Sequence, residues 1–550
     1  MRTLLFLFAL VCAINIQAQQ YSKLKVYLNP IAENLIQERG LELDHGIVKK
    51  GVFLINDFDA ETIAWMDESG IQYDVLIEDV KHFYTTRKDN SNSRGNRDAC
   101  FTTQNDTIDI PENFQLGSMG GFYTYQEFLQ NLDSMHALFP DLISERAVID
   151  TFLTHEGLAL YQVKISDNVS VNENEPELLY TAIHHAREPQ SMTQLIFFMW
   201  YMLENYATDD EVKYLVDNTQ MYFVPMVNPD GYIYNETTDP NGGGMWRKNR
   251  RNNGDGTDGV DLNRNYGYEW GIDNQGSSPN TGSETYRGLS AFSEQETRAV
   301  AWLSEQHQFT LALNYHAYGN YLIYPWGTGT VLTPDSNTFI ALATEMTRVN
   351  NYVFGTGVQT VGYNVNGDSD DWMYGEQTTK NKMLSMTPEV GKQDDGFWPM
   401  TSRITPLSQE NLLPNMLLAH FAGDYATIAS LESQFIEDLT GNINFSATRL
   451  GLEFNGPYSF GVEPISSNIS NLGAAVDLNA MVIAEANPVS VSYELDPLII
   501  EGEDVVYDLV ATFNGFSVKQ RVTRVFGSAT AITQNDGDIS AFVSGSDWNE

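Results

Sequence analysis

The chain has 550 residues, more than a single hydrophobic core accommodates, and 42% of them are hydrophobic, so two to four packed domains are expected. Its formal net charge at pH 7 is −42, which repels nucleic acid and anionic membranes, so neither is expected as a partner. After residue 18 no stretch reaches about 18 uncharged apolar residues, so no membrane-spanning helix is expected either.

Residues 1–18 have the features of a secretory signal peptide. Arg2 supplies the positive end, residues 4–14 form the apolar segment, and Ala18 ends a small-residue cleavage site. We therefore expect a secreted, extracellular bacterial protein. Only Cys100 remains after cleavage, so no internal disulfide is expected, and any metal ion must be held by His, Asp or Glu.

Residues 19–86 predict a small α+β unit. The segment at 87–110 then becomes polar, basic and glycine-containing, which is typical of a linker. Its basic residues suit cleavage by an activating protease and suit a plain tether equally well. Within the α+β unit the apolar spacing predicts strands at 24–28, 51–55 and 73–77 and helices at 31–39 and 59–69.

Residues 111–427 alternate between strand-like and helix-like patterns. This alternation predicts an α/β domain with a mixed, mostly parallel sheet flanked by helices. In such folds ligands bind beyond the carboxyl ends of the strands, where His185, Asp230, His316 and Glu389 lie. The predicted strands are 161–165, 178–183, 221–226, 310–315, 321–324 and 383–387, and the predicted helices are 124–139, 191–206, 293–307, 337–350 and 408–421.

Residues 428–550 contain short alternating segments such as Val489-Ser490-Val491-Ser492-Tyr493. These predict an all-β accessory domain of the sandwich type, without a catalytic cluster and with an unknown partner. The last residues form no recognisable ending, so whether this domain is complete at Glu550 is left open.

The segment 178–189 concentrates the polar groups at the end of a predicted strand. His185 and Glu188 are spaced i, i+3, so a tight turn directs both at one point, which suits a zinc ion. His316, at the end of a later strand, would complete a three-ligand set that leaves one position for water. Alone, His316 is more often a hydrogen-bonded core residue, and Glu389 is either a general base or a surface carboxylate.

Two further segments, 246–250 and 260–266, are rich in Arg and Asn. In so acidic a chain, arginines beside Trp and Asn indicate recognition of an anion, because guanidinium grips a carboxylate with two parallel hydrogen bonds.

Together these segments resemble the zinc metallocarboxypeptidases of the carboxypeptidase A/B type, especially the secreted bacterial ones. The resemblance implies the α/β fold described above, one zinc ion per catalytic domain, and hydrolysis of the C-terminal peptide bond of peptides or proteins. Across residues 114–427 the motifs follow in family order: Ile183-His184-His185-Ala186-Arg187-Glu188, Asn228-Pro229-Asp230-Gly231, Trp246-Arg247-Lys248-Asn249-Arg250, Val260-Asp261-Leu262-Asn263-Arg264-Asn265, Ser283-Glu284-Thr285-Tyr286, Tyr315-His316-Ala317-Tyr318, Tyr363 eight positions before Asp371-Trp372, and Thr387-Pro388-Glu389.

The resemblance implies a role for each matching polar residue in the metal motif. His185, Glu188 and His316 match the zinc ligands. Asp261 matches the carboxylate that orients the first histidine. His184 is not a ligand in this interpretation and is expected only to pack or to form a hydrogen bond nearby.

The remaining matches concern the reaction and the substrate. Glu389 matches the general base, which takes a proton from a water whose pKa zinc lowers toward about 7, and Arg247 matches the group that stabilises the oxyanion. No position departs from the family pattern, which argues against an inactive homologue. The residues that match substrate-binding positions are Arg187, Asn263, Arg264 and Tyr363.

The resemblance also places Asp370 at the base of the side-chain pocket. An acidic residue there implies preference for C-terminal Lys or Arg, and Coulomb attraction agrees. Asp368 resembles an acidic pocket position in bacterial enzymes of broader specificity. We therefore expect good cleavage of basic residues with tolerance for others.

Three further expectations stay open at this point. The unit at 19–86 resembles, weakly, the pro-segments of this family, so a zymogen cut within 87–110 is one hypothesis. The alternatives for function are a peptidoglycan amidopeptidase or deacylase of related fold, and an inert surface-binding protein. Calcium is conceivable at the acidic loop 255–259, although a solvated turn explains that loop equally well.

Overall fold

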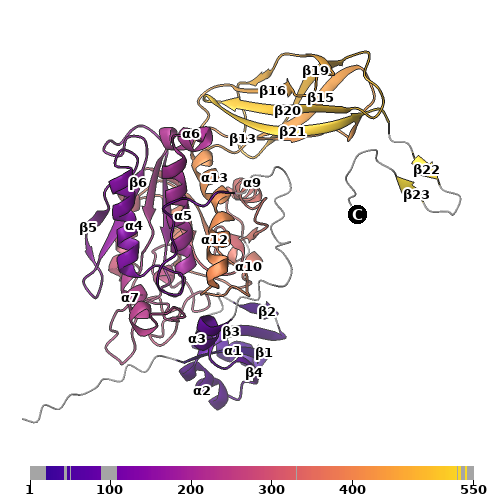
Figure 1. Ribbon diagram of the computed structural model, residues 1–550. Helices are drawn as coiled ribbons and strands as arrows, with labels where there is room; N and C mark the ends of the chain where they lie inside the picture. Colours follow the sequence, from indigo (N-terminus) through magenta and orange to yellow (C-terminus); the bar gives the residue numbers. More distant parts are fainter. Residues whose placement is uncertain are drawn as a thin grey trace, which may run out of the picture.

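The structure is a computed structural model that describes residues 20–41, 46–49, 51–87, 108–329, 331–528, 531–533 and 539–541. The predicted signal peptide, most of the predicted linker and both cysteines lie outside these residues. Within the described residues, no helix is long and apolar enough to cross a bilayer. Figure 1 shows a central α/β body with a small unit at one end and β-sheets at the other.

The N-terminal unit (residues 20–87) is an α+β fold, as predicted. Its four strands form an antiparallel sheet in the order β2-β3-β1-β4. Leu24, Val26, Leu54 and Phe58 form its own small core. The elements are β1 (Tyr21–Tyr27), α1 (Pro30–Arg39), β2 (Ile47–Lys49), β3 (Phe53–Asp59), α2 (Ala60–Glu68), β4 (Tyr73–Ile77) and α3 (Val80–Thr86). The sequence patterns missed β2, whose three residues are too few to show an alternation, and α3, whose seven residues form only about two helical turns.

The central body is built on an eight-stranded mixed sheet in the order β11-β10-β12-β9-β7-β8-β6-β5. Its middle strands, β12, β9, β7 and β8, are parallel, and antiparallel strands flank them. The mixed sheet is therefore as predicted. The strands are β5 (Ala147–Leu153), β6 (Ala159–Ile165), β7 (Glu177–Ala182), β8 (Gln220–Val224), β9 (Phe309–Tyr315), β10 (Tyr321–Ile323), β11 (Val353–Gly355) and β12 (Leu384–Glu389).

Helices cover both faces of this sheet. Alternate residues of one strand face opposite sides, so in β7 Leu178 and Tyr180 join the core beneath α5 and α13, whereas Leu179 joins the core beneath α8 and α11. The helices are α4 (Tyr125–Leu138), α5 (Pro189–Asn205), α6 (Asp210–Asn218), α7 (Pro229–Thr238), α8 (Gln295–Gln306), α9 (Ser336–Met346), α10 (Gly357–Thr360), α11 (Ser369–Gly375), α12 (Thr401–Gln409) and α13 (Leu412–Ala422), with a 3₁₀ turn η1 (Leu262–Arg264).

One predicted helix is divided in two. The apolar pattern predicts a single helix over 408–421, but α12 ends at Gln409 and α13 begins at Leu412. Pro414 accounts for the break, because it has no N–H to donate to the carbonyl of Glu410 and lies in the first turn of α13, where no such donor is needed.

The C-terminal unit (residues 426–527) contains two β-sheets, in the orders β13-β15-β19-β17 and β14-β21-β20-β16-β18. Its all-β character confirms the prediction. Inward residues of both sheets, such as Phe445, Val491 and Leu509, join the same apolar cluster as the central body. The strands are β13 (Ala426–Ser430), β14 (Phe435–Ile436), β15 (Thr440–Arg449), β16 (Tyr458–Pro464), β17 (Ile469–Leu472), β18 (Val476–Leu478), β19 (Ala486–Leu495), β20 (Asp504–Phe513) and β21 (Phe516–Phe526), followed by the pair β22 (Ala531–Thr533) and β23 (Ile539–Ala541).

Candidate active site

Three side chains from two distant segments of the sequence meet beyond the carboxyl ends of β7 and β9. The Nδ1 atom of His185 lies 2.8 Å from Glu188 Oε1, and Nδ1 of His316 lies 2.9 Å from Glu188 Oε2. The two Nδ1 atoms are 3.0 Å apart. Because β7 and β9 are parallel neighbours, their ends bring His185 and His316 together.

The turn after β7 is strained. Ile183 has a φ of +53°, a left-handed conformation that β-branched residues rarely adopt. The chain is held there because Asn228 N donates to Ile183 O over 2.9 Å and Ala186 N donates to Arg247 O over 2.9 Å. The turn ends at Glu188, and Pro189 begins α5 with a φ already suited to a helix.

The three groups fit a catalytic zinc ion. His185, Glu188 and His316 are at most 2% exposed, and their ligand atoms converge within 4.8 Å. Burial raises the pKa of Glu188, but His185 and His316 outweigh burial and hold that pKa well below its ordinary value. A buried carboxylate between two imidazoles is the His₂Glu donor set that leaves a zinc position open.

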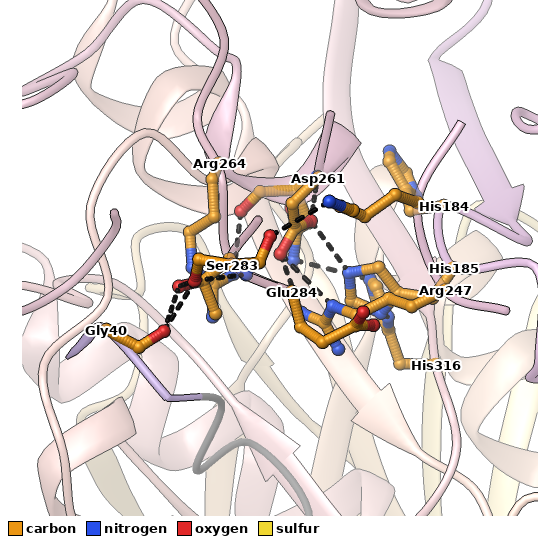
Figure 2. A network of polar contacts seen from close by, with 12 residues as sticks. Gly40, His184, His185, Arg247, Asp261, Arg264, Ser283, Glu284 and His316 are labelled. Atoms are coloured by element: carbon orange, nitrogen blue, oxygen red, sulfur yellow. Dashed lines mark hydrogen bonds and ion pairs between the residues drawn. The ribbon is translucent and has the colours of Figure 1, made fainter. Parts of the chain in front are cut away.

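Asp261 joins the metal ligands to an arginine. Its Oδ1 accepts hydrogen bonds from His185 Nε2 at 3.1 Å and from Asn263 N at 2.9 Å. Its Oδ2 accepts from Arg247 Nε at 3.1 Å and from Nη2 at 2.9 Å. Burial raises the pKa of Asp261, but Arg247 and His185 outweigh it, so the carboxyl stays ionised. Figure 2 shows this network between Arg247 and the two ligand histidines.

A cavity opens beside the candidate zinc ligands. Glu389, the last residue of β12, lies in its wall and is placed beside His316 by the hydrogen bond from His316 N to Pro388 O, 2.9 Å long. The structure thus brings the predicted base and most predicted substrate residues into one space. The lining residues named by the sequence are His185, Asn263, Arg264, His316, Tyr363, Asp368, Asp370 and Glu389.

The two acidic residues of this cavity have different surroundings. Asp370 accepts from Asn314 Nδ2 at 2.8 Å and from Thr387 Oγ1 at 2.7 Å, so both of its oxygens are engaged. Asp368 uses Oδ1 to cap α11, accepting from Asp371 N at 2.9 Å. Its buried Oδ2 has no hydrogen-bond partner among the described residues.

Arg187 lies away from this cavity, although the sequence groups it with the substrate residues. Its guanidinium stacks over Phe397, 4.2 Å from the ring centroid, and lies 4.0 Å from Glu284. It lines a second cavity, shared with Asp57 and Phe58 of the N-terminal unit. Arg187 therefore sits where the N-terminal unit meets the central body.

Sequence reasoning missed one neighbour of a site residue: Phe397, which stacks on Arg187, belongs to a loop without a period. His184 stacks on His316 and its Nε2 lies 2.8 Å from the Tyr266 hydroxyl, which agrees with the expectation that it packs or forms a hydrogen bond nearby.

The acidic side chains of the loop at 255–259 accept hydrogen bonds from neighbouring residues. Asp255 accepts from Thr257 N at 2.9 Å and from the hydroxyls of Thr257 and Thr281, both at 2.6 Å. Arg250 Nη2 donates to Asp258 at 3.3 Å. These contacts describe a hydrogen-bonded turn.

Comparison with known proteins places this geometry in a family. The zinc carboxypeptidase family pattern matches residues 128–414. Carboxypeptidase B of Astacus astacus is 30% identical over 313 residues, covering 55% of this chain and 97% of that protein. A zinc carboxypeptidase of Saccharothrix mutabilis subsp. capreolus is 30% identical over 320 residues, covering 56% and 69%. The crystal structure of thrombin activatable fibrinolysis inhibitor shares the fold, with a TM-score of 0.56, 22% identity, and coverage of 73% of this chain and 98% of that one. This chain therefore belongs to the zinc carboxypeptidase family and is an enzyme of the carboxypeptidase A/B type.

Proposed function

We propose that this enzyme is secreted, that it removes single C-terminal residues from peptides and proteins, and that it favours Lys and Arg while tolerating others. The observation that carries the proposal is the cavity in which His185, His316 and Glu389 share the lining with Asn263, Arg264 and two aspartates. The signal-like residues 1–18 support secretion.

The site residues have separate roles in the proposed reaction. Zinc held by His185, Glu188 and His316 would polarise the scissile carbonyl and acidify the attacking water. Glu389 accepts the proton of that water and then delivers it to the leaving amine. Arg247, oriented by Asp261, donates to the oxygen on which negative charge develops.

The substrate terminus is gripped at the other side of the cavity. Arg264 supplies a guanidinium for the terminal carboxylate. Its Nη1 donates a hydrogen bond to the carbonyl of Asn263 over 2.8 Å, which fixes the position of the guanidinium. The Asn263 side chain is also fixed by a hydrogen bond, because its Oδ1 accepts from Ser369 N at 2.9 Å. Tyr363 lines the same cavity from the 361–368 loop. A free C-terminal carboxylate is the ligand that this set matches.

The test of this assignment is Glu389→Gln. The variant keeps the shape of the side chain but cannot take a proton, so we expect turnover to fall by about 10²–10⁴-fold while zinc content and peptide binding persist. Glu410→Gln is the matched control, because Glu410 lies between α12 and α13, where its side chain accepts from the Tyr352 hydroxyl at 3.1 Å. Full activity of Glu389→Gln would overturn the assignment.

Within the pocket we propose that Asp368 and Asp370 act differently. Asp368 offers a buried oxygen for a cationic side chain, whereas Asp370 is already bonded to Asn314 and Thr387. Burial and, to a smaller extent, the neighbouring Asp368 together raise the pKa of Asp370 to about 8. At neutral pH Asp370 is therefore largely uncharged, which lets the pocket accept neutral residues too.

Peptides ending in Arg, Phe and Glu test this specificity at pH 6 and pH 9. As pH rises through about 8, Asp370 loses its proton and the preference for Arg over Phe should increase roughly tenfold. Asp370→Asn should remove the increase, and Asp368→Asn should lower the preference at both pH values. A clear preference for Phe over Arg in the wild type would contradict the proposal.

We further propose that the N-terminal unit is a pro-segment. The hydroxyl of Ser283 donates to Gly40 O, and Gln393 Nε2 donates to Gly46 O over 3.0 Å. Figure 2 shows Gly40 reaching the edge of the polar network that contains the zinc ligands. After α3, Arg87 donates to the carbonyls of Asp394 and Asp395 at 2.8 Å and to that of Trp398. We propose that these contacts restrict the approach of a substrate to the cavity, so that cleavage within 87–110 activates the enzyme.

A further inference from the structure

His184 is buried against the metal site although it is not placed to bind metal. It is 0% exposed, and its ring is stacked on that of His316, with centroids 5.5 Å apart and planes 20° from parallel. Its Nε2 lies 2.8 Å from the hydroxyl of Tyr266. Figure 2 shows the His184 ring directed away from the point where the ligand atoms converge.

The two ligand histidines are oriented by different means. His185 has a carboxylate behind it, because its Nε2 contacts Asp261. When Nδ1 of His316 binds metal, its Nε2 carries the proton, yet the contact of hydrogen-bond length that this atom makes among the described residues is with Asn263 Nδ2, at 3.4 Å. That atom is itself a donor, because Asn263 Oδ1 accepts from Ser369 N. Among the described residues no acceptor therefore orients His316 from behind.

Tyr266 fixes His184 from the other side. It is fully buried, its N donates to Gly367 O over 2.8 Å, and its ring packs against Phe292 and Trp372 at centroid distances of 5.9 and 5.7 Å. Trp372 belongs to α11, the helix that carries Asp370 and that Asp368 caps. A continuous row of rings thus connects the pocket helix to His316.

We propose that His184 is a positioning residue: its ring, held by the Tyr266 hydroxyl, sets the plane of the His316 ring and so directs Nδ1 toward the metal. The inference rests on the proposed role of His316 as a zinc ligand. In this proposal, stacking by His184 orients His316, just as the hydrogen bond to Asp261 orients His185.

The protonation of His184 agrees with this role. Its buried Nδ1 has no hydrogen-bond partner among the described residues, so the proton belongs on Nε2, which donates to Tyr266.

Three variants of the full chain test the proposal: His184→Ala, His184→Phe and Tyr266→Phe. The readouts are zinc affinity from competition with a chelator, the visible absorption spectrum of the Co²⁺-loaded protein, and kcat and KM. We expect His184→Ala to weaken zinc binding and lower kcat by about 10–100-fold, to change the Co²⁺ spectrum, and to leave KM nearly unchanged. His184→Phe keeps a flat ring, so it should recover most of the zinc affinity and kcat that His184→Ala loses. Tyr266→Phe should have values between those of His184→Ala and His184→Phe.

Tyr180→Phe is the matched control. Tyr180 is equally buried and its hydroxyl donates to Asn415 O over 2.7 Å, away from the metal ligands, so only stability should change. Wild-type zinc affinity and an unchanged Co²⁺ spectrum in His184→Ala would overturn the proposal, as would a His184→Phe variant no better than His184→Ala. Retention of zinc by His316→Ala would instead refute the ligand assignment on which it rests. Circular dichroism of the metal-free variants identifies any that fail to fold.

Discussion

The two units attached to the central body share apolar surface with it to different extents. The N-terminal unit has its own core, contributes the buried residues Tyr21 and Val80 to the apolar cluster of the central body, and is also held by hydrogen bonds such as those from Arg87 and to Gly40. The C-terminal unit contributes buried residues from most of its strands, such as Phe445, Val491 and Leu509, to that same cluster. At that junction the Phe516 ring lies 4.7 Å from Tyr214 and 5.1 Å from His420.

This difference indicates different lifetimes of attachment. When a polar junction separates, water replaces its hydrogen bonds. Each of these bonds therefore stabilises the attached state by only about 0.5–1.5 kcal/mol. An apolar junction has no such replacement, and separating it exposes aromatic surface. The N-terminal unit, whose junction has the smaller apolar part, is therefore suited to release and the C-terminal unit to permanent attachment.

Cleavage of the chain within residues 87–110 should produce the largest effect. We expect kcat/KM on a peptide ending in Arg to rise by roughly 100-fold, which corresponds to about 2.7 kcal/mol of pro-segment docking. Activity assays before and after removal of the N-terminal unit measure this. Equal activity of the uncut, zinc-loaded chain would show that the unit does not inhibit.

Substitution of Arg87 by Ala should loosen the N-terminal unit without cleavage. It removes charge-assisted hydrogen bonds to three carbonyls, so we expect the activity of the uncut chain to rise about tenfold. Lys25→Ala is the control, because Lys25 lies over the rings of Tyr27 and Phe53 within the same unit. A rise of the same size in Lys25→Ala would assign the effect to lost charge alone.

Phe516→Ala tests the apolar junction. Loss of a half-buried ring should lower the thermal unfolding temperature by roughly 3–6 °C and leave kcat at 25 °C unchanged. Differential scanning calorimetry measures this, with Leu498→Ala as the control since Leu498 is 84% exposed. An altered kcat in Phe516→Ala would mean that the C-terminal unit affects the active site.

The smallest expected effect is a pH dependence at the same junction. His420 Nε2 lies 2.8 Å from Glu211 Oε1, and although burial raises the pKa of Glu211, His420 holds it below the ordinary value of 4.5. A depressed carboxyl pKa stabilises the fold above about pH 4.5 and the contribution is lost as pH falls through the lowered value. The unfolding temperature of Glu211→Gln should therefore decrease less between pH 6 and pH 3.5 than that of the wild type. Equal decreases in unfolding temperature for the wild type and Glu211→Gln would exclude the Glu211–His420 pair as a source of acid sensitivity.

Much of the fold follows from local patterns. The central strands and long helices of the α/β body have clear periods, and the sequence places His185, His316 and Glu389 at strand ends, where they lie. Breaks are harder to predict, because the apolar pattern continues across Pro414 although its missing N–H divides the helix. Short elements such as β2 show no period at all.

The site was predictable where the sequence itself contains the geometry. The i, i+3 spacing of His185 and Glu188 is local, whereas His316 joins them only because β9 lies beside β7 in the sheet. The position of Arg187 depends on how the N-terminal unit docks, which no spacing encodes. The stacking of His184 depends on a ring 132 positions away in the sequence.

The shared carboxylate of Asp261 has a consequence for genetics. Because it holds His185 with one oxygen and Arg247 with the other, a substitution there perturbs metal binding and charge stabilisation together. The costs of Asp261→Asn and Arg247→Ala will therefore not add in the double variant, since each single change already disturbs the other partner. Natural variation at these two positions should be epistatic, and one should rarely change while the other is kept.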